Sequence, residues 1–247
     1  MSLVELEVPA GEPRAVAAAE RVLRWLTIGG KRTRTEPRGI PPRSDASIEG
    51  NAVAACTRLG LASDPRVRLL AEALVAWQWP DGGWNCDASA TGRRSSFHET
   101  LATMWGLHEY GAATGDRAAK RAARRAAELL LQHRLFRRHG TGEPIHPTWL
   151  VLHYPAYWHY DILQALVVLD RMGLATDQRA TDALDILESR RLPDGRWRPG
   201  GYWWSPPGSG RATPEVVDWG RGAPSEMLTL NALRVLKAAG RWTPRPA

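Results

Sequence analysis

The sequence predicts an all-α fold in which about four pairs of inner and outer helices form a small or incomplete α/α toroid. Three observations lead to this prediction. A segment running from a glycine to a tryptophan turn occurs twice, helices of small and apolar residues alternate with amphipathic ones, and the first kind of helix ends at glycine. The 247 residues are expected to form one domain, 1–247, with the repeats at about 47–240.

The repeated segment begins at Gly60 and again at Gly173, and a similar turn follows 20 residues after each glycine. Apolar residues recur at helical spacing between each glycine and its turn, which predicts an amphipathic helix. Asp64 and Asp177 are suited to cap these two helices at their N-termini. The turns have the sequences PDGGW, at 80–84, and PDGRW, at 193–197.

Two classes of helix are expected to alternate along the chain. Inner helices are small or apolar on most sides, as buried helices are, and they are predicted at 51–60, 97–111, 158–173 and 224–240. Outer helices have one apolar stripe and an Arg-rich face, and they are predicted at 13–27, 64–78, 115–134 and 176–191. Glycine after each inner helix fits a C-terminal capping position.

The first turn together with Gln78 and Trp79, QWPDGGW, resembles the QW motif of squalene-hopene-type cyclases. The core of that motif is Gln, a short gap, Gly, any residue and Trp. The second turn matches its latter half, with Arg190 or Arg191 where Gln is expected. The resemblance implies the α/α toroid of the terpenoid-cyclase and protein-prenyltransferase superfamily, in which such turns staple helix ends together.

The same resemblance points to a candidate acid. Squalene-type cyclases place an Asp-x-Asp-Asp-Thr-Ala motif at the start of an inner helix, and its middle Asp protonates the substrate. When Gly106-Leu107 is aligned with the Ala-Leu that follows that motif, the segment SFHETL at 96–101 falls on it. The resemblance then implies that His98 and Glu99 are acid–base residues. The usual acidic triad is absent.

Polar residues at the starts of the inner helices are expected to converge on one mouth of the toroid. This group consists of Glu49, His98, Glu99, His153, Tyr157, His159, Asp161 and Glu226. Several titratable groups in a Trp-lined cavity favour shifted pKa values and acid–base chemistry. The predicted catalytic residues are His98, Glu99, Asp161 and His159, and the predicted substrate-binding residues are Trp105, Trp158, Tyr157, His153, Trp203, Trp204 and Glu226.

The resemblance implies an apolar, isoprenoid-like small molecule as the substrate, and the many Trp residues fit this because aromatic faces stabilise carbocations. Aromatic faces also stack on sugars, so a carbohydrate-active α/α barrel using Tyr157, Tyr160 and Asp161 stays an alternative. Protein prenyltransferases bind zinc through Asp, Cys and His, so a zinc-dependent enzyme using Cys86, His98 and Asp161 is a second alternative. A non-catalytic binding protein is a third. Apart from zinc, no cofactor is indicated.

Composition limits the partners and the compartment. The chain has 12 Trp against 2 Phe and a net charge of +7, yet no zinc-finger, RNP-type or basic-heptad pattern indicates nucleic acid. Two cysteines, no apolar run long enough to span a bilayer and no signal peptide predict a cytoplasmic protein. An incomplete ring would expose apolar helix faces and favour a homodimer. Peripheral contact with an anionic membrane is an alternative for the cationic run Arg117, Lys120, Arg121, Arg124, Arg125, Arg134, Arg137 and Arg138.

Overall fold

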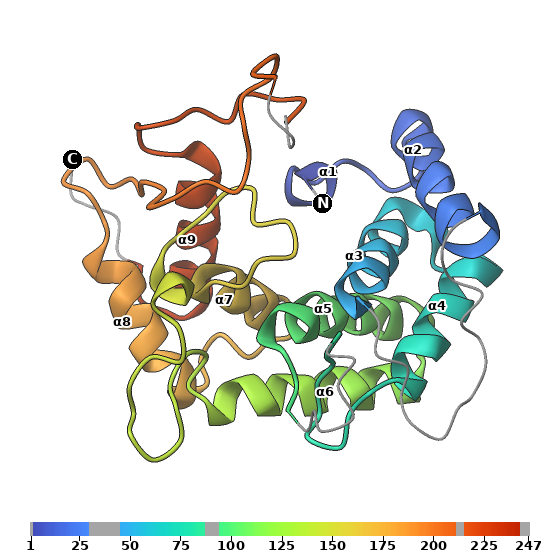
Figure 1. The fold of residues 1–247 in the computed structure, drawn as a ribbon, viewed down its shortest axis with the longest axis horizontal. Helices are drawn as coiled ribbons and strands as arrows, with labels where there is room; N and C mark the ends of the chain where they lie inside the picture. Colours follow the sequence, from blue (N-terminus) through green and yellow to red (C-terminus); the bar gives the residue numbers. More distant parts are fainter. Residues whose placement is uncertain (1, 30–44, 87–93, 211–214, 243–247) are drawn as a thin grey trace. The chain divides into compact units, whose positions relative to one another are not determined.

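The computed structural model of the chain describes residues 2–29, 45–86, 94–210 and 215–242 (Figure 1). Its contacts divide the chain into two compact units, unit 1 (Met1–Leu129) and unit 2 (Leu130–Ala247), and each unit is described by itself. The single domain expected from the sequence therefore stays a prediction. All regular elements of the described residues are helices, and the only β pairing among them consists of three isolated bridges, so the all-α class is confirmed.

Unit 1 contains the helices that the sequence predicts, with shifted ends, and one short helix, α1 (Ser2–Glu5), that the sequence does not predict. The predicted helices are α2 (Pro13–Arg24), α3 (Ala46–Cys56), α4 (Pro65–Ala76), α5 (Phe97–Thr114) and most of α6 (Arg117–Gln132). Five-residue π-helical turns follow α2 and α3, at Trp25–Gly29 and Thr57–Leu61. Helix α3 begins at Ala46 rather than at residue 51, so the predicted inner helix is one turn too short.

Helices α3 and α5 form the centre of unit 1 and approach each other very closely. A Cβ atom on Gly50 would lie 2.6 Å from the backbone of Thr103, and a Cβ atom on Gly106 would lie 2.4 Å from the Gly50 carbonyl oxygen. Neither glycine can be replaced without moving a backbone. These two small residues therefore set the distance between the two inner helices of unit 1.

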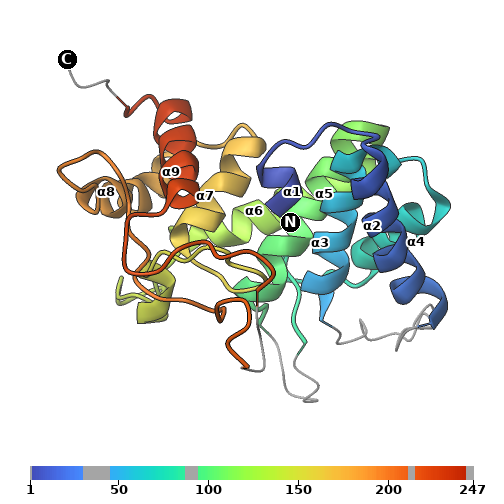
Figure 2. The ribbon, with the colours of Figure 1, turned by 90° about the horizontal axis from the view of Figure 1, so that it is seen from above.

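Unit 2 contains the end of α6 and, among its described residues, five further helical stretches. They are a 3₁₀ turn at Pro147–Leu150, α7 (Ile162–Arg171), a 3₁₀ turn at Gln178–Ala180, α8 (Thr181–Ser189) and α9 (Glu226–Ala238). Helices α7 and α9 lie side by side in both views (Figures 1 and 2). Helix α7 begins after Asp161 and not at residue 158 as predicted, because the Asp161 carboxylate caps it by accepting from the Gln164 N–H at 2.9 Å.

The tryptophan turn of unit 1 ties the end of α4 to the start of α5. The Trp84 indole is buried and donates from Nε1 to the Leu74 carbonyl at 2.9 Å. The Trp84 backbone N–H donates to Thr100 Oγ1 at 3.1 Å, and its carbonyl accepts from the Ser96 N–H at 2.8 Å. Ser96 is the N-cap residue of α5. One turn thus secures the ends of two helices.

The tryptophan turn of unit 2 makes the same three bonds between α8 and α9. Trp197 Nε1 donates to the Leu187 carbonyl at 2.8 Å, and the Trp197 N–H donates to Thr229 Oγ1 at 3.1 Å. The Trp197 carbonyl accepts from the N–H of Ser225, the N-cap residue of α9, at 2.8 Å. The repeat seen in the sequence is therefore a repeat of hydrogen bonding as well.

The two turns differ at the position of the motif glutamine. In unit 1, Gln78 Nε2 donates to the carbonyls of Gly82 and Ala122, at 2.7 and 2.8 Å, and so links the turn to the middle of α6. In unit 2, the guanidinium of Arg191 lies over the Trp197 ring, 5.8 Å from its centroid. Only the unit 1 turn has the complete glutamine staple.

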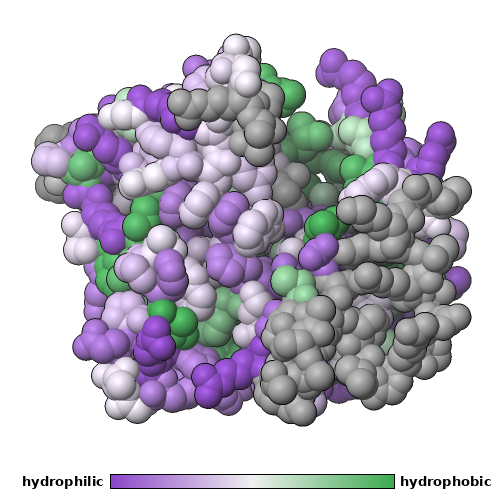
Figure 3. Space-filling view, viewed as in Figure 1, coloured by the Kyte–Doolittle hydropathy of each residue, from purple (hydrophilic) through white to green (hydrophobic). Residues whose placement is uncertain are grey.

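The outer face of α6 is basic and solvated. Its alanines at 119, 122, 123, 126 and 127 are buried, whereas Arg117, Lys120, Arg121, Arg124 and Arg125 are exposed. Hydrophilic residues cover most of the described surface in the view of Figure 3. Among the described helices, none combines the length and apolar character that crossing a membrane would need.

Candidate active site

Four rings of unit 2 are in contact, from a buried histidine to an exposed tryptophan. The His153 ring lies 4.8 Å from the Trp203 ring, and the His159 ring stacks on Trp203 at 3.9 Å with 3° between the planes. Trp158 stacks on His159 at 4.0 Å and 23°. Two indole rings that both stack on one imidazole at about 4 Å cannot lie on the same face of it. The His159 imidazole therefore lies between the indoles of Trp158 and Trp203. We call Trp158, His159, Trp203 and His153 the ring cluster.

Burial changes the protonation of His159. Its pKa is lowered because desolvation disfavours the imidazolium; a bond to the Ala156 backbone opposes this shift, and nearby His153 adds to it. Trp158 remains 50% exposed, so the cluster reaches solvent at this end. His159 is therefore a neutral imidazole near neutral pH, placed between aromatic faces close to the surface.

Asp161 connects the ring cluster to the start of α7. Besides capping the helix, its carboxylate accepts from the His153 backbone N–H at 3.1 Å, and its Oδ2 lies 3.5 Å from His153 Nδ1. Both side chains are buried, and His153 Nδ1 has no hydrogen-bond partner among the described residues. Burial lowers the pKa of Arg190, and the negative charge of Asp161 partly offsets this shift. Asp161 thus fixes the backbone beside both histidines.

The long segment after the Trp197 turn supplies the rim of this site. The Arg221 guanidinium lies over the rings of Tyr202 and Trp204, 4.5 and 5.0 Å from their centroids. Tyr157 OH donates to Glu215 Oε2 at 2.6 Å, which joins the segment to the loop before α7. The Tyr157 pKa is raised, first by burial and then by the Glu215 carboxylate. The rim combines aromatic faces with one cation and one carboxylate.

The predicted acid–base pair of unit 1 has a different environment. Glu99 is buried and accepts from the Ser47 N–H at 2.7 Å and from Ser47 Oγ at 3.1 Å, so it satisfies the N-terminus of α3. Burial raises the Glu99 pKa, although both Ser47 bonds oppose the shift and the negative charges of Asp45 and Glu49 add to it. His98, next to it at the start of α5, is partly exposed.

The predicted convergence of all these residues on one mouth stays a prediction. His98, Glu99 and the buried Glu49 belong to unit 1, whereas His153, Tyr157, His159 and Asp161 belong to unit 2. Within unit 2, the structure brings His153, His159 and Asp161 together with Trp158 and Trp203. Glu226, also in unit 2, is exposed in the first turn of α9.

Several aromatic residues predicted to bind substrate are packed in the core. Trp105 is buried and donates from Nε1 to Glu109 Oε1 at 2.8 Å. Trp204 is buried and donates to the Tyr154 carbonyl at 3.1 Å. Tyr160, part of the carbohydrate alternative, is buried and donates to the Leu135 carbonyl at 2.6 Å, so it is not a base in an open groove. Their satisfied polar atoms indicate a packing role.

The zinc alternative gains no support from the described residues. Within 2–29, 45–86, 94–210 and 215–242, no three His, Cys, Asp or Glu side chains are grouped so that they could hold a metal ion. Cys86 is exposed in unit 1, and Asp161 is committed to two backbone N–H groups in unit 2.

Sequence reasoning missed two residues of the rim, namely Glu215 and Arg221. The available signal was the unusual Gly-, Pro- and Trp-rich composition of the segment after Trp197. No protein-family model matches the chain, and a search of curated proteins found no match to it.

Proposed function

We propose that unit 2 is the catalytic part of an enzyme that acts on an apolar, isoprenoid-like substrate by acid–base chemistry at the ring cluster. His159 is the base, and Trp158 and Trp203 bind the substrate and stabilise developing positive charge. Asp161 and His153 position the loop that carries His159. The observation that carries this proposal is the His159 imidazole between two indoles, with its pKa lowered by burial.

We further propose that the chain is related to terpenoid cyclases and protein prenyltransferases, and that its helix pairs belong to a small or incomplete α/α toroid. The matching hydrogen bonds of Trp84 and Trp197 support a helical-repeat architecture of this kind. The Gln78 bonds support the stapling role that the QW resemblance implies. Acid–base roles of His98 and Glu99, a homodimer and peripheral membrane contact remain predictions of the sequence.

Substrate binding is tested with farnesol, geranylgeraniol and squalene in detergent micelles, followed by quenching of tryptophan fluorescence. Trp158→Phe should weaken binding about 5- to 10-fold, because the smaller ring loses about 1 kcal/mol of stacking and contact area. Trp25→Phe is the matched control, since Trp25 is also 50% exposed but lies in unit 1. Equal affinity in all three proteins would argue against the ring cluster as the site.

Catalysis is tested by gas chromatography of the same compounds after incubation with enzyme. His159→Gln should keep the affinity and the helical circular dichroism but lose turnover by a factor of about 100 or more, as expected for removal of a general base. His108→Gln, on α5, should leave turnover unchanged. Turnover that survives in His159→Gln would end this assignment.

A carbohydrate substrate is a second candidate, because the Trp158 ring is half-exposed and the next residue along the chain, Tyr157, is exposed as well. Exposed aromatic rings are of the kind that stacks on sugar rings. Cello- and chito-oligosaccharides in the same fluorescence titration distinguish the two classes. Binding of these sugars without binding of the polyprenoids would favour it.

A further inference from the structure

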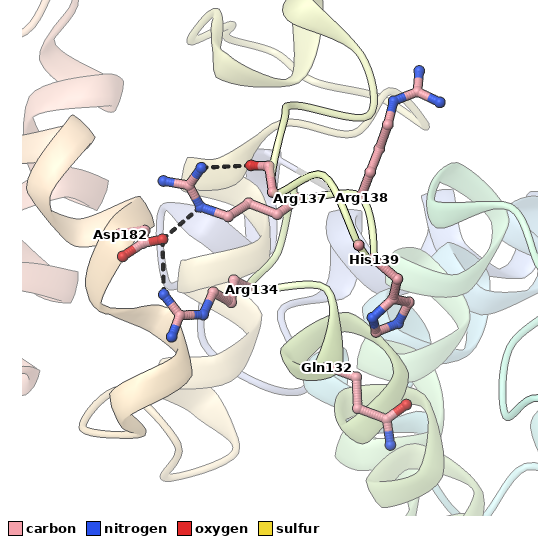
Figure 4. Close-up of a pocket in the computed structure, with 8 residues that line it drawn as sticks. Gln132, Arg134, Arg137, Arg138, His139 and Asp182 are labelled. Carbon is pink, nitrogen blue, oxygen red and sulfur yellow. Dashed lines mark hydrogen bonds and ion pairs between the residues drawn. The ribbon is translucent and has the colours of Figure 1, made fainter.

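The turn that follows α6 in unit 2 lines an open pocket, whose residues are separate from those of the ring cluster. Its volume is about 570 Å³, and its walls are formed by Gln132, Arg134, Arg137, Arg138, His139, Gly140, Gly142 and Asp182 (Figure 4). This volume lies within the range of about 300–1,000 Å³ that is typical of small-molecule sites. The turn itself is closed by the Ile145 N–H, which donates to the Phe136 carbonyl at 2.7 Å.

Positive charge exceeds negative charge in this pocket. Arg134 Nη1 and Arg137 Nε both donate to Asp182 Oδ2, at 3.2 and 2.5 Å, so one carboxylate faces two guanidinium groups. Burial opposes ionisation of Asp182, but the bonds from Arg137 and Arg134 outweigh it and lower the Asp182 pKa. Asp182 is therefore a fixed anion that neutralises only one of the two cations. An anionic ligand would balance the other.

The cations are held in place before any ligand binds. Arg137 makes a second bond, from Nη1 to the Gly142 carbonyl at 2.6 Å, so its planar group is fixed from two sides. The Arg138 guanidinium is directed away from Asp182, as Figure 4 shows, and donates to the carbonyls of Pro144 and Ile145. It adds charge at the rim without blocking the pocket. Gly140 and Gly142 have open space where a Cβ atom would be, so no side chain narrows the opening there.

We propose that this pocket binds the phosphate or diphosphate group of a small molecule. Guanidinium groups present planar forks of N–H donors that match phosphate oxygens, and a bond to an ionised partner is about twice as strong as a neutral one. Arg134 supplies the exposed donors, with 56% of its side chain accessible, and Arg137 supplies the fixed ones. His139 adds an imidazole on the same wall. The opposing interpretation is that the two arginines serve only to bind Asp182 and so hold the turn against α8.

Inorganic pyrophosphate is the probe, titrated by calorimetry into the full chain in 150 mM salt. We expect saturable binding with one site per chain. Arg134→Gln should weaken it at least 10-fold, because the loss of one charge-assisted donor pair costs that much or more. Arg196→Gln should leave it unchanged. This control removes the same charge from a side chain that is 50% exposed and paired with Asp194 outside the pocket.

The phosphate could belong to a lipid headgroup or to a soluble molecule. Flotation of the protein with vesicles that contain phosphatidic acid distinguishes these two sources. Binding that is lost in Arg134→Gln but kept in Arg196→Gln identifies a phosphorylated lipid headgroup. Pyrophosphate binding without flotation identifies a soluble phosphorylated ligand. Circular dichroism of both variants establishes that they are folded. The proposal is overturned if pyrophosphate shows no saturable binding up to 10 mM, or if the two variants weaken it equally.

Discussion

The tryptophan turns of unit 1 and unit 2 are nearly identical in bonding, yet the segments that follow them differ greatly. The chain runs from Trp84 to the capping Ser96 through residues 85–95, but from Trp197 to the capping Ser225 through residues 198–224. The bonds at both ends of these segments are the same. The repeat therefore tolerates a long insertion between two fixed points, as loops between secured helix ends generally do.

The insertion supplies one of the four rings of the ring cluster, Trp203, and the aromatic residues that Arg221 contacts. Trp203 stacks on His159, and Arg221 covers Tyr202 and Trp204. The hydrogen bonds that the two turns share stabilise both units. Only the longer segment, in unit 2, contributes residues to a candidate site. The comparison thus separates the scaffold from the site within one chain.

A second difference lies three residues after each capping serine. The N–H groups of Glu99 and Leu228 occupy matching positions and donate to Ser96 Oγ and Ser225 Oγ, at 3.5 and 3.3 Å. Leu228 is fully buried among apolar neighbours, whereas Glu99 uses its carboxylate to hold the N-terminus of α3. Unit 2 caps the corresponding helix α7 with its own Asp161. The residue at this position therefore stabilises the fold in both units, through apolar burial at Leu228 and through hydrogen bonds at Glu99.

The largest expected effect is removal of either turn tryptophan. Trp84→Ala and Trp197→Ala should each cost about 3–5 kcal/mol of unfolding free energy, because each leaves a cavity where a large buried ring was. Urea denaturation measures the loss, and hydrogen exchange locates it. Trp84→Ala should raise exchange in α4 and α5, and Trp197→Ala in α8 and α9. A loss more than about 2 kcal/mol larger in one variant would break the equivalence of the two turns.

A smaller effect is expected when Glu99 is made to resemble its counterpart. Glu99→Leu should cost about 1–3 kcal/mol, because the buried Ser47 N–H loses its acceptor. Ser47→Ala, which removes only the hydroxyl bond, should cost about 1 kcal/mol. Urea denaturation measures both. A more stable Glu99→Leu protein would mean that burying the carboxylate costs more than its two bonds return.

The elements that sequence could predict are those fixed by local chemistry. Asp64 caps α4 as predicted, accepting from the Arg66 N–H at 2.8 Å. Asp177 accepts from the Arg179 N–H at 2.9 Å and so caps the 3₁₀ turn that leads into α8. Each of these bonds spans two residues, so residue type and spacing suffice to predict it. The burial of Trp84 and Trp197 follows in the same way from the repeated turn.

The candidate site could be predicted only in part, because its contacts join distant residues. His159 and Asp161 were identified from their types and their place before an inner helix, but Trp203 reaches His159 only through the folded insertion. The predicted start of α7 at residue 158 is too early, because Trp158 and His159 have no local feature that stops a helix. The Glu99 bonds to Ser47 span 52 residues, and no periodicity encodes such a pair.

Glu99 and Leu228 also differ in how they affect stability at different pH values, because only Glu99 can titrate. Because burial raises the Glu99 pKa in the folded protein above its ordinary value of 4.5, folding favours the protonated form. Stability from this group is therefore highest at low pH and falls as pH rises from about 4.5 through the folded pKa. Glu99→Gln removes this dependence. Urea midpoints at pH 4, 5, 6 and 7 give the stability of wild type relative to Glu99→Gln. Wild type should become less stable relative to Glu99→Gln as pH rises. A relative stability that stays constant or rises with pH would contradict the raised Glu99 pKa.

The smallest expected difference concerns the residue before each turn. Gln78→Ala removes bonds to the carbonyls of Gly82 and Ala122, and two such bonds contribute about 1–2 kcal/mol together. Arg191→Ala removes a guanidinium 5.8 Å from the Trp197 ring centroid, a contact that contributes about 0.5 kcal/mol at most at this distance. Urea midpoints of the two variants test this order. Gln78 links its turn to the middle of α6, and Arg125 of α6 adds a second link by donating to the Pro80 carbonyl at 2.9 Å. Gln78→Ala should therefore raise hydrogen exchange in the middle of α6, whereas Arg191→Ala should change exchange only next to Trp197. If the two losses are equal, the arginine replaces the glutamine staple, and the two turns are closer in function than their bonds indicate.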